Sequence, residues 1–377
     1  MSNTISSILT NLLKNNMMKR KSLLLIVMML ALTSLSTINA QEKKKLIGDY
    51  LSISGWMNIQ YDYESQLQND GATLDQINTF NVRRARLDFK GNITKNVEFR
   101  VQGDLAGTPK LVDGFVKVKL HKSFNIQAGQ FKIPFTFENP QSPLTLEGIE
   151  YAQVISKLSG YSDMSGVKTY SGGRDVGLMI YGNFLKFERN GKEIPILTYK
   201  LGVFNGNGMN NKDANLLKDI AGSIEVCPGV EGLMLAASYY GGNYNLAAAN
   251  KNDANRNRLT FGGKYENGRL TVRSEYIMGD TEMADKLGEV YNLESDGFYV
   301  SAGYWFNIKE QRIRPVARYD FFRQDIHNHD LNSTYYMVGI DWWPYKNLRL
   351  LVNYTMKDKP GFDNMGNLWQ AQLSVKF

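Results

Sequence analysis

Six positively charged side chains lie where alternation along a strand can present them together to an anion. Arg84 and Arg86 flank Ala85, and two lysines further along the chain flank a valine in the same way. Because successive side chains of a strand point to opposite faces, each pair shares one polar face. Arginine's planar guanidinium matches the geometry of phosphate, and such cations can replace an anion's hydration shell. The candidate anion-binding residues are Arg84, Arg86, Lys117, Lys119, Lys132 and Arg174.

Acidic neighbours offer an alternative role for these cations. Asp88, Glu98 and Asp104 lie on the polar faces of nearby predicted strands, where they can pair with the cations instead. Later strands carry four more arginines on polar faces, which can extend the cationic row: Arg273, Arg314, Arg318 and Arg349.

Catalysis and metal binding have little support in this sequence. The chain contains three histidines and no Gly-x-Ser-x-Gly motif, so a hydrolase would lack its usual base and nucleophile turn. His327 and His329 stand in a predicted polar loop, where a solvated loop is a simpler interpretation than a metal site. We therefore expect no enzyme activity, no cofactor and no metal.

The N-terminal 40 residues have the pattern of a secretory signal. Lys19, Arg20 and Lys21 precede an apolar run over residues 23–35, and small residues follow up to Ala40. We expect translation to start at one of the two methionines at 17 and 18, and cleavage after residue 40. Removing residues 1–40 removes four of the 44 Lys and Arg and none of the 37 Asp and Glu, so the net charge falls from +7 to about +3. A charge this small gives no compositional support for nucleic-acid binding.

Beyond residue 50 the dominant sequence period is two. Val97, Phe99 and Val101, for example, alternate with Glu98 and Arg100. About 16 segments show this alternation, an even number typical of bacterial outer-membrane barrels. Past the N-terminus no run of about 18 apolar residues occurs, which excludes a membrane protein built of helices.

The connections between these segments alternate in length. Short turns such as residues 121–123 and 266–269 alternate with longer polar loops, which cover residues 64–79, 106–113, 132–173, 205–217, 242–257, 279–297, 323–333 and 355–368. Short periplasmic turns and long external loops are typical of outer-membrane barrels, and a soluble sandwich has no reason to keep this rhythm. The sequence therefore predicts an all-β fold over residues 41–377: a transmembrane antiparallel up-and-down β-barrel of about 16 strands.

The longest loop, residues 132–173, is expected to fold into the barrel. Its Pro134, Pro140 and Pro143 favour a fixed irregular path over additional strand. A barrel of about 16 strands is wide enough to hold an aqueous channel, and the chain is too short to add a plug domain. An inward loop would narrow this channel; a loop that stays outside is the alternative.

The last predicted strand points to the outer membrane. Trp369, Leu373 and Val375 alternate with polar residues, and the strand ends on Phe377. A terminal Phe on such a strand resembles the signal read by the barrel assembly machinery. We therefore expect an integral protein of the bacterial outer membrane, surrounded by outer-membrane lipid.

Four motifs resemble the phosphate-selective porin family of porins O and P. They are Arg83-Arg84-Ala85-Arg86-Leu87 leading to Gly91, Gly129-Gln130-Phe131-Lys132-Ile133-Pro134-Phe135, Gly173-Arg174-Asp175-Val176-Gly177, and Val203-Phe204-Asn205-Gly206. The resemblance covers essentially the whole mature chain. It implies a homotrimer of 16-stranded barrels with pores that conduct small anions such as phosphate. Within the first motif, Arg83 falls on the opposite register and is expected near a strand end or a subunit contact.

Two other functions fit a barrel of this kind. A non-selective general porin would pass small solutes without preferring anions, in keeping with the small net charge. An adhesin or structural barrel would use its external loops, such as residues 205–211 and 243–257, to bind a partner. Conductance separates an open channel from a closed barrel.

Overall fold

The structure is a computed structural model that describes residues 51–67, 74–160, 163–165, 173–189, 192–213, 215–361 and 365–377. The expected signal segment, residues 1–40, lies outside these ranges. Residues 53–377 form one compact unit.

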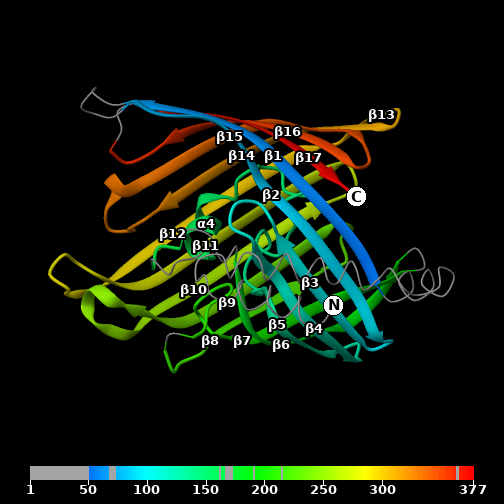
Figure 1. The fold of residues 1–377 in the computed structure, drawn as a ribbon, viewed down its shortest axis with the longest axis horizontal. Helices are drawn as coiled ribbons and strands as arrows, with labels where there is room; N and C mark the ends of the chain where they lie inside the picture. Colours follow the sequence, from blue (N-terminus) through cyan, green and yellow to red (C-terminus); the bar gives the residue numbers. More distant parts are fainter. Residues whose placement is uncertain are drawn as a thin grey trace, which may run out of the picture. The chain divides into compact units, whose positions relative to one another are not determined.

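The described strands form one antiparallel sheet that closes on itself (Figure 1). β1 pairs with β17 at the seam, and also with β2. The strands are β1 (Leu51–Leu67), β2 (Leu74–Thr94), β3 (Val97–Asp104), β4 (Lys110–His121), β5 (Phe124–Lys132), β6 (Arg174–Arg189), β7 (Lys192–Phe204), β8 (Asp219–Val226), β9 (Leu233–Leu246), β10 (Lys251–Glu266), β11 (Leu270–Ala284), β12 (Val290–Tyr304), β13 (Phe306–Ile308), β14 (Gln311–Arg323), β15 (Asn332–Tyr345), β16 (Leu348–Asp358) and β17 (Gly366–Lys376).

Among these described strands, β12 and β13 together occupy one strand position of the barrel. Both pair with β14, and they are separated only by Trp305. The described residues therefore form a closed antiparallel barrel of 16 strands, and the predicted fold class is confirmed.

Alternation along each strand separates a polar inner wall from an apolar outer surface. At the seam, Asn58 and Gln60 are buried, while their neighbours Met57 and Ile59 are exposed. The Gln60 and Asn58 side chains bond to Gln372 across the β1–β17 pair at 2.7 and 2.9 Å. Outward residues meet lipid and inward residues meet the lumen, so a one-residue shift would expose the polar row to lipid.

Several connections are shorter than the sequence predicts, because the strands continue past the apolar band. Residues 242–257, expected to be a loop, are mostly strand: β9 runs to Leu246, β10 starts at Lys251, and Asn255 pairs with Asn243. Likewise β2 begins at Leu74, and the connection between β11 and β12 covers only residues 285–289. Beyond the membrane both faces of a strand meet water, so backbone pairing continues there without alternating apolar residues.

The connection between β5 and β6, residues 133–173, is hereafter the inner segment. It contains the helix α4 (Gln153–Leu158), which packs against β11, β12 and β14 and lies amid the strands in Figure 1. Phe135, Ile155 and Leu158 are almost fully buried in the hydrophobic cluster between segment and barrel. Two short 3-10 turns, η2 (Ala247–Ala249) and η3 (His329–Leu331), lie in later connections.

The two ends of the inner segment are joined at its base. Ile133 N donates to Gly173 O at 3.0 Å, and the Asn139 amide donates to the same carbonyl at 3.2 Å. Gly173 has a φ of +66°, and a Cβ there would lie 1.9 Å from Asn139 Oδ1. Glycine is required here both by the backbone conformation and by the close approach of the amide.

Among the described residues, no helix combines the length and the apolar character needed to cross a membrane.

The outer surface predicts the effect of a charge facing lipid. Val338, near the middle of β15, is 55% exposed on the apolar face. Val338→Arg is expected to lower the free energy of unfolding in a phospholipid bilayer by about 2–4 kcal/mol, because the guanidinium must enter hydrocarbon. Urea titration of the refolded barrel measures this loss, and Val338→Leu is the matched control. Equal stability of the two variants would contradict a lipid-facing position.

Candidate anion site in the lumen

A cavity of about 430 Å³ lies between the inner faces of β1 to β7 and the start of the inner segment. We call it the cationic cavity. On the segment side its lining includes the apolar Pro134, Pro140 and Leu144 and the polar Gln141 and Ser142. On the barrel side it is lined by six cations and two acids: Arg86, Lys90, Arg100, Lys132, Arg174, Lys200, Asp88 and Asp113.

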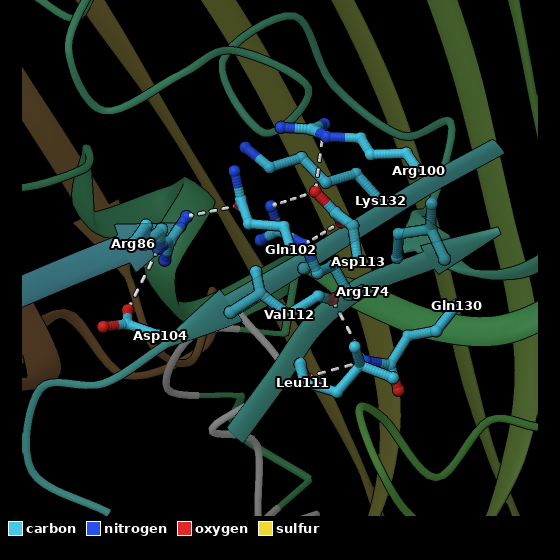
Figure 2. Close-up of polar contacts among 12 residues, drawn as sticks. Arg86, Arg100, Gln102, Asp104, Leu111, Val112, Asp113, Gln130, Lys132 and Arg174 are labelled. Atoms are coloured by element: carbon cyan, nitrogen blue, oxygen red, sulfur yellow. Dashed lines mark hydrogen bonds and ion pairs between the residues drawn. The ribbon is translucent and has the colours of Figure 1, made fainter. Parts of the chain in front are cut away.

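A chain of alternating charges crosses the barrel side of this cavity. Arg100 donates to both oxygens of Asp88 at 2.8 and 2.9 Å and reaches Asp113 at 3.0 Å. Arg174 Nε donates to the other oxygen of Asp113 at 2.6 Å. Figure 2 shows the Arg100 and Arg174 side chains converging on Asp113 from two sides. This chain fixes the guanidiniums in place, since each carboxylate receives donors in good geometry.

Arg86 is oriented by Asp104 at the edge of the same cavity. Its Nε donates to Asp104 Oδ2 at 3.0 Å, and its guanidinium lies 5.0 Å from the centroid of the Trp56 ring. The backbone N–H groups of Ala85 and Ala106 donate to Asp104 at 3.0 and 3.2 Å. The carboxylate is thus held by the backbone and in turn holds the arginine (Figure 2).

Lys132 carries a charge that no carboxylate neutralises directly. Its Nζ donates to the carbonyl oxygens of Asn139 and Gln141, both at 2.5 Å. Within the ranges that the structure describes, no ion pair involves Lys132. The amine therefore ties the strand to the inner segment through two neutral carbonyls beside the cavity.

Counting charges gives the cavity a positive excess. Five of the six lining cations contact four carboxylates: Asp88 and Asp113 in the lining, Asp104 beside Arg86, and Glu225 beside Lys200. Lys132 contacts none of them. In formal charges, six cations and four carboxylates leave an excess of about two positive charges. A positive excess between low-dielectric walls attracts and concentrates anions.

Three of the six residues proposed from the sequence line the cationic cavity, namely Arg86, Lys132 and Arg174. Lys117 lies beside the rings of Phe115 and Tyr181, at 5.4 and 5.8 Å. The other two lie elsewhere: Lys119 pairs with Glu98 and lines a different cavity by the short turns, and Arg84 has a buried Nη1 without a hydrogen-bond partner among the described residues.

Sequence reasoning did not select Lys90, Arg100 and Lys200, which also line the cavity. Alternation placed Lys90 and Arg100 on polar faces, so the signal was present. The sequence did not show which polar residues of β2, β3 and β7 face the same space beside the inner segment.

Arg83 does not lie where its register suggested. Its guanidinium contacts both carboxylate oxygens of Glu150 of the inner segment at 2.7 Å, and Gln370 Nε2 of β17 donates to Glu150 Oε1 at 3.4 Å. Arg83 therefore contacts the inner segment, where a strand end or a subunit contact was expected.

The opposite wall uses its arginines to hold the inner segment. Arg349 donates to Leu146 O at 2.6 Å, and Arg318 donates to Glu150 O at 2.8 Å. Glu147 of the segment pairs with two further wall arginines, Arg273 and Arg314, both at 3.2 Å. The four later arginines proposed to extend the cationic row are thus buried beneath the segment.

Wall carboxylates bind the backbone of the same segment. Glu275 accepts from the N–H groups of Phe137 and Glu138 at 2.5 and 3.0 Å. Asp320 accepts from the N–H of Gln153 at 2.9 Å. Buried amides of an irregular segment need such acceptors, because no strand partner satisfies them.

The pKa values of two carboxyls in the segment are shifted in opposite directions. Burial raises the pKa of Glu138 above its ordinary value. Burial also raises the pKa of Asp163, but Arg258 and Arg256, with hydrogen bonds from Ser165, outweigh it and hold that pKa below its ordinary value. The Asp163–Arg258 pair, at 2.8 Å, therefore persists where an ordinary aspartate is already partly protonated and is lost only as the pH falls through the lowered value.

Solved structures of three bacterial proteins share this fold at low sequence identity. An anion-selective porin from Comamonas acidovorans has a TM-score of 0.59 and 12% identity, covering 87% of this chain and 99% of that chain. The outer membrane channel DcaP of Acinetobacter baumannii has a TM-score of 0.59 and 13% identity, covering 87% and 97%. The trimer form of OmpT from Vibrio cholerae has a TM-score of 0.54 and 12% identity, covering 87% and 100%. No protein with a curated description is significantly similar in sequence.

A closed 16-stranded barrel with a polar lumen and an apolar outer surface is the architecture of an outer-membrane porin. The sequence profile of the family called phosphate-selective porin O and P matches residues 56–360. The chain belongs to this family, as its motifs predicted. It is therefore an outer-membrane channel protein and not an enzyme.

The contacts of Glu147 predict how the inner segment is held. Glu147→Gln removes the charge shared by Arg273 and Arg314, and breaking a buried pair of this kind costs about 3–5 kcal/mol. The segment should leave the wall more often, giving larger and noisier single-channel currents in a planar bilayer. Glu98→Gln, which removes an exposed pairing with Lys119, is the control. Identical current noise in both variants would show that Glu147 does not hold the segment.

Proposed function

We propose that this porin conducts small inorganic anions in preference to cations, with phosphate as the preferred class. The single observation that carries the proposal is the cationic cavity, where four side chains, Arg86, Arg100, Lys132 and Arg174, surround one space with an excess of positive charge. Phosphate suits this site, because three guanidiniums in fixed positions and one ammonium can replace much of its hydration.

The inner segment acts in this proposal as the constriction of the channel. Arg318 and Arg349 bind it to one wall of the barrel. The cationic cavity lies between the segment and the other wall. An anion crossing the lumen would pass the cationic cavity where the channel is narrowest. The segment's apolar side, with Pro134 and Pro140, would exclude water and strengthen the field of the cations.

Export and assembly are proposed on other grounds. Residues 1–40 would direct export and be removed, and the strand ending at Phe377 would be recognised by the barrel assembly machinery. A homotrimer is supported by the family and by the trimer form of OmpT from Vibrio cholerae. Anion preference agrees with the anion-selective porin from Comamonas acidovorans.

Two alternative functions are weaker on specific observations. A non-selective porin does not account for the fixed guanidiniums of Arg100 and Arg174 around one cavity. An adhesin needs long external loops, but the connection between β9 and β10 is short and its expected loop residues are largely strand.

Conductance of refolded residues 41–377 tests the proposal. In a planar bilayer with a salt gradient, the reversal potential should favour anions, and added phosphate should reduce the chloride current. Lys132→Gln keeps a hydrogen-bond donor but removes the charge, and Arg86→Gln removes another. Each should raise the half-blocking phosphate concentration about tenfold, because a charged hydrogen bond contributes about 1.5–3 kcal/mol.

The control for this experiment is Lys119→Gln, since Lys119 lies outside the cationic cavity and pairs with Glu98. Equal phosphate block in all four proteins would overturn the assigned site. Channels without anion preference would indicate a general porin, and a folded barrel without channels would favour the adhesin.

A further inference from the structure

A second cavity, of about 420 Å³, lies on the other side of the inner segment. We call it the aromatic cavity. Leu144 lines both cavities, so the two spaces adjoin across the segment. Thr145 of the inner segment also lines it. The rest of the lining comes from the ends of β10, β14, β15 and β17, from Trp305, and from short turns at residues 310 and 346. The aromatic cavity therefore lies between the inner segment and the short-turn mouth of the barrel.

Two tryptophans, Trp305 and Trp343, line this cavity. Trp305 lies between β12 and β13, and Trp343 lies on β15, two residues after the buried Asp341. The two sequence neighbours of Trp305, Tyr304 and Phe306, are 37% and 50% exposed on the outer face. By alternation both indoles face the lumen, where a purely polar wall would be expected.

Cationic side chains lie over the rings of both indoles. Arg312 and Arg314 lie 4.1 and 4.4 Å from the Trp305 centroid. Lys376 lies 4.8 Å from the Trp343 centroid. A guanidinium over an aromatic face is held by the ring, so the N–H groups at its edge keep a fixed direction without using a carboxylate.

Three cations that line the aromatic cavity have no carboxylate partner in the described part of the chain. Among the described residues, Arg312, Lys346 and Lys376 form no ion pair, and all three line the aromatic cavity. Of the lining carboxylates, Asp341 is bonded to Arg314 and Arg349, and Glu266 lies 3.7 Å from Lys264.

The only further lining carboxylate among the described residues is Glu310, which is exposed in its turn. Three unpaired cations therefore face one carboxylate across a space large enough for a small organic molecule.

We propose that the aromatic cavity binds organic anions that carry an aromatic ring, such as aryl phosphates or aryl carboxylates. The ring would lie against Trp305 or Trp343, and the anionic group would meet Arg312, Lys346 and Lys376. An anion of this class leaving the cationic cavity would have a second site before the short-turn mouth. The inference extends the proposed anion preference to a substrate class that inorganic phosphate does not represent.

Calorimetric titration of the refolded, detergent-solubilised barrel with phenyl phosphate and methyl phosphate tests this site. The two probes share one anionic group and differ in the ring. Phenyl phosphate should bind about three- to tenfold more tightly, the range expected for an added aromatic contact. Trp343→Leu and Trp305→Leu should each reduce that ratio toward one.

Trp342→Leu is a matched control, because this neighbouring indole falls on the outer register and donates to Gln311 at 3.0 Å. It should keep the wild-type ratio. Arg312→Gln is a second test in an exposed position, suited to the case in which a tryptophan variant fails to fold. It should weaken phenyl phosphate binding about tenfold.

The outcome is separable from that of the proposed function. Phosphate block of chloride current reports the cationic cavity and should be unchanged in Trp343→Leu. Equal affinities for the two probes, or a ratio that survives both tryptophan substitutions, would overturn the aromatic site while leaving the phosphate proposal intact. A high ratio in a barrel without anion-selective current would support the aromatic site alone.

Discussion

The structure depends on how the barrel satisfies charges on its inner wall. Lipid surrounds the outer face, so every charged side chain of the strands must find partners or water inside. On one wall, Arg273, Arg314 and Arg349 are buried and bonded to acids and to the inner segment. Removing either side of these contacts would leave a buried charge without a partner, which costs far more than the contact itself contributes.

The division of the lumen follows from this constraint. Arginines and carboxylates of one wall supply donors and acceptors to an irregular segment that has no strand partner of its own. With that wall covered, the cations of the other wall face the remaining space. Arg86 and Arg174, held by Asp104 and Asp113, line the cationic cavity. One set of charges thus shapes the passage, and the other is left to meet the solute.

The inner segment also separates two chemically different spaces. On one side its prolines face fixed guanidiniums and an ammonium; on the other, Leu144 and Thr145 meet two indoles. Both spaces combine cations with aromatic rings, since Trp56, Phe115 and Phe131 also line the cationic cavity. They differ in how the cations are held. Arg100 and Arg174 of the cationic cavity are bonded to Asp113, whereas Arg312, Lys346 and Lys376 of the aromatic cavity form no ion pair among the described residues.

The sequence alone determined the barrel and the faces of its strands. A period of two requires no tertiary information, and residues such as Arg100 could be assigned to the polar face from their neighbours alone. Only the tertiary structure decided which polar residues meet. Arg349 binds Leu146 across 203 positions, and Lys132 binds carbonyls of the segment rather than an acid. Alternation reports which face a side chain takes, but the closure of the barrel and the path of an irregular segment set its partners. For that reason three proposed cations reached the cavity together and three did not.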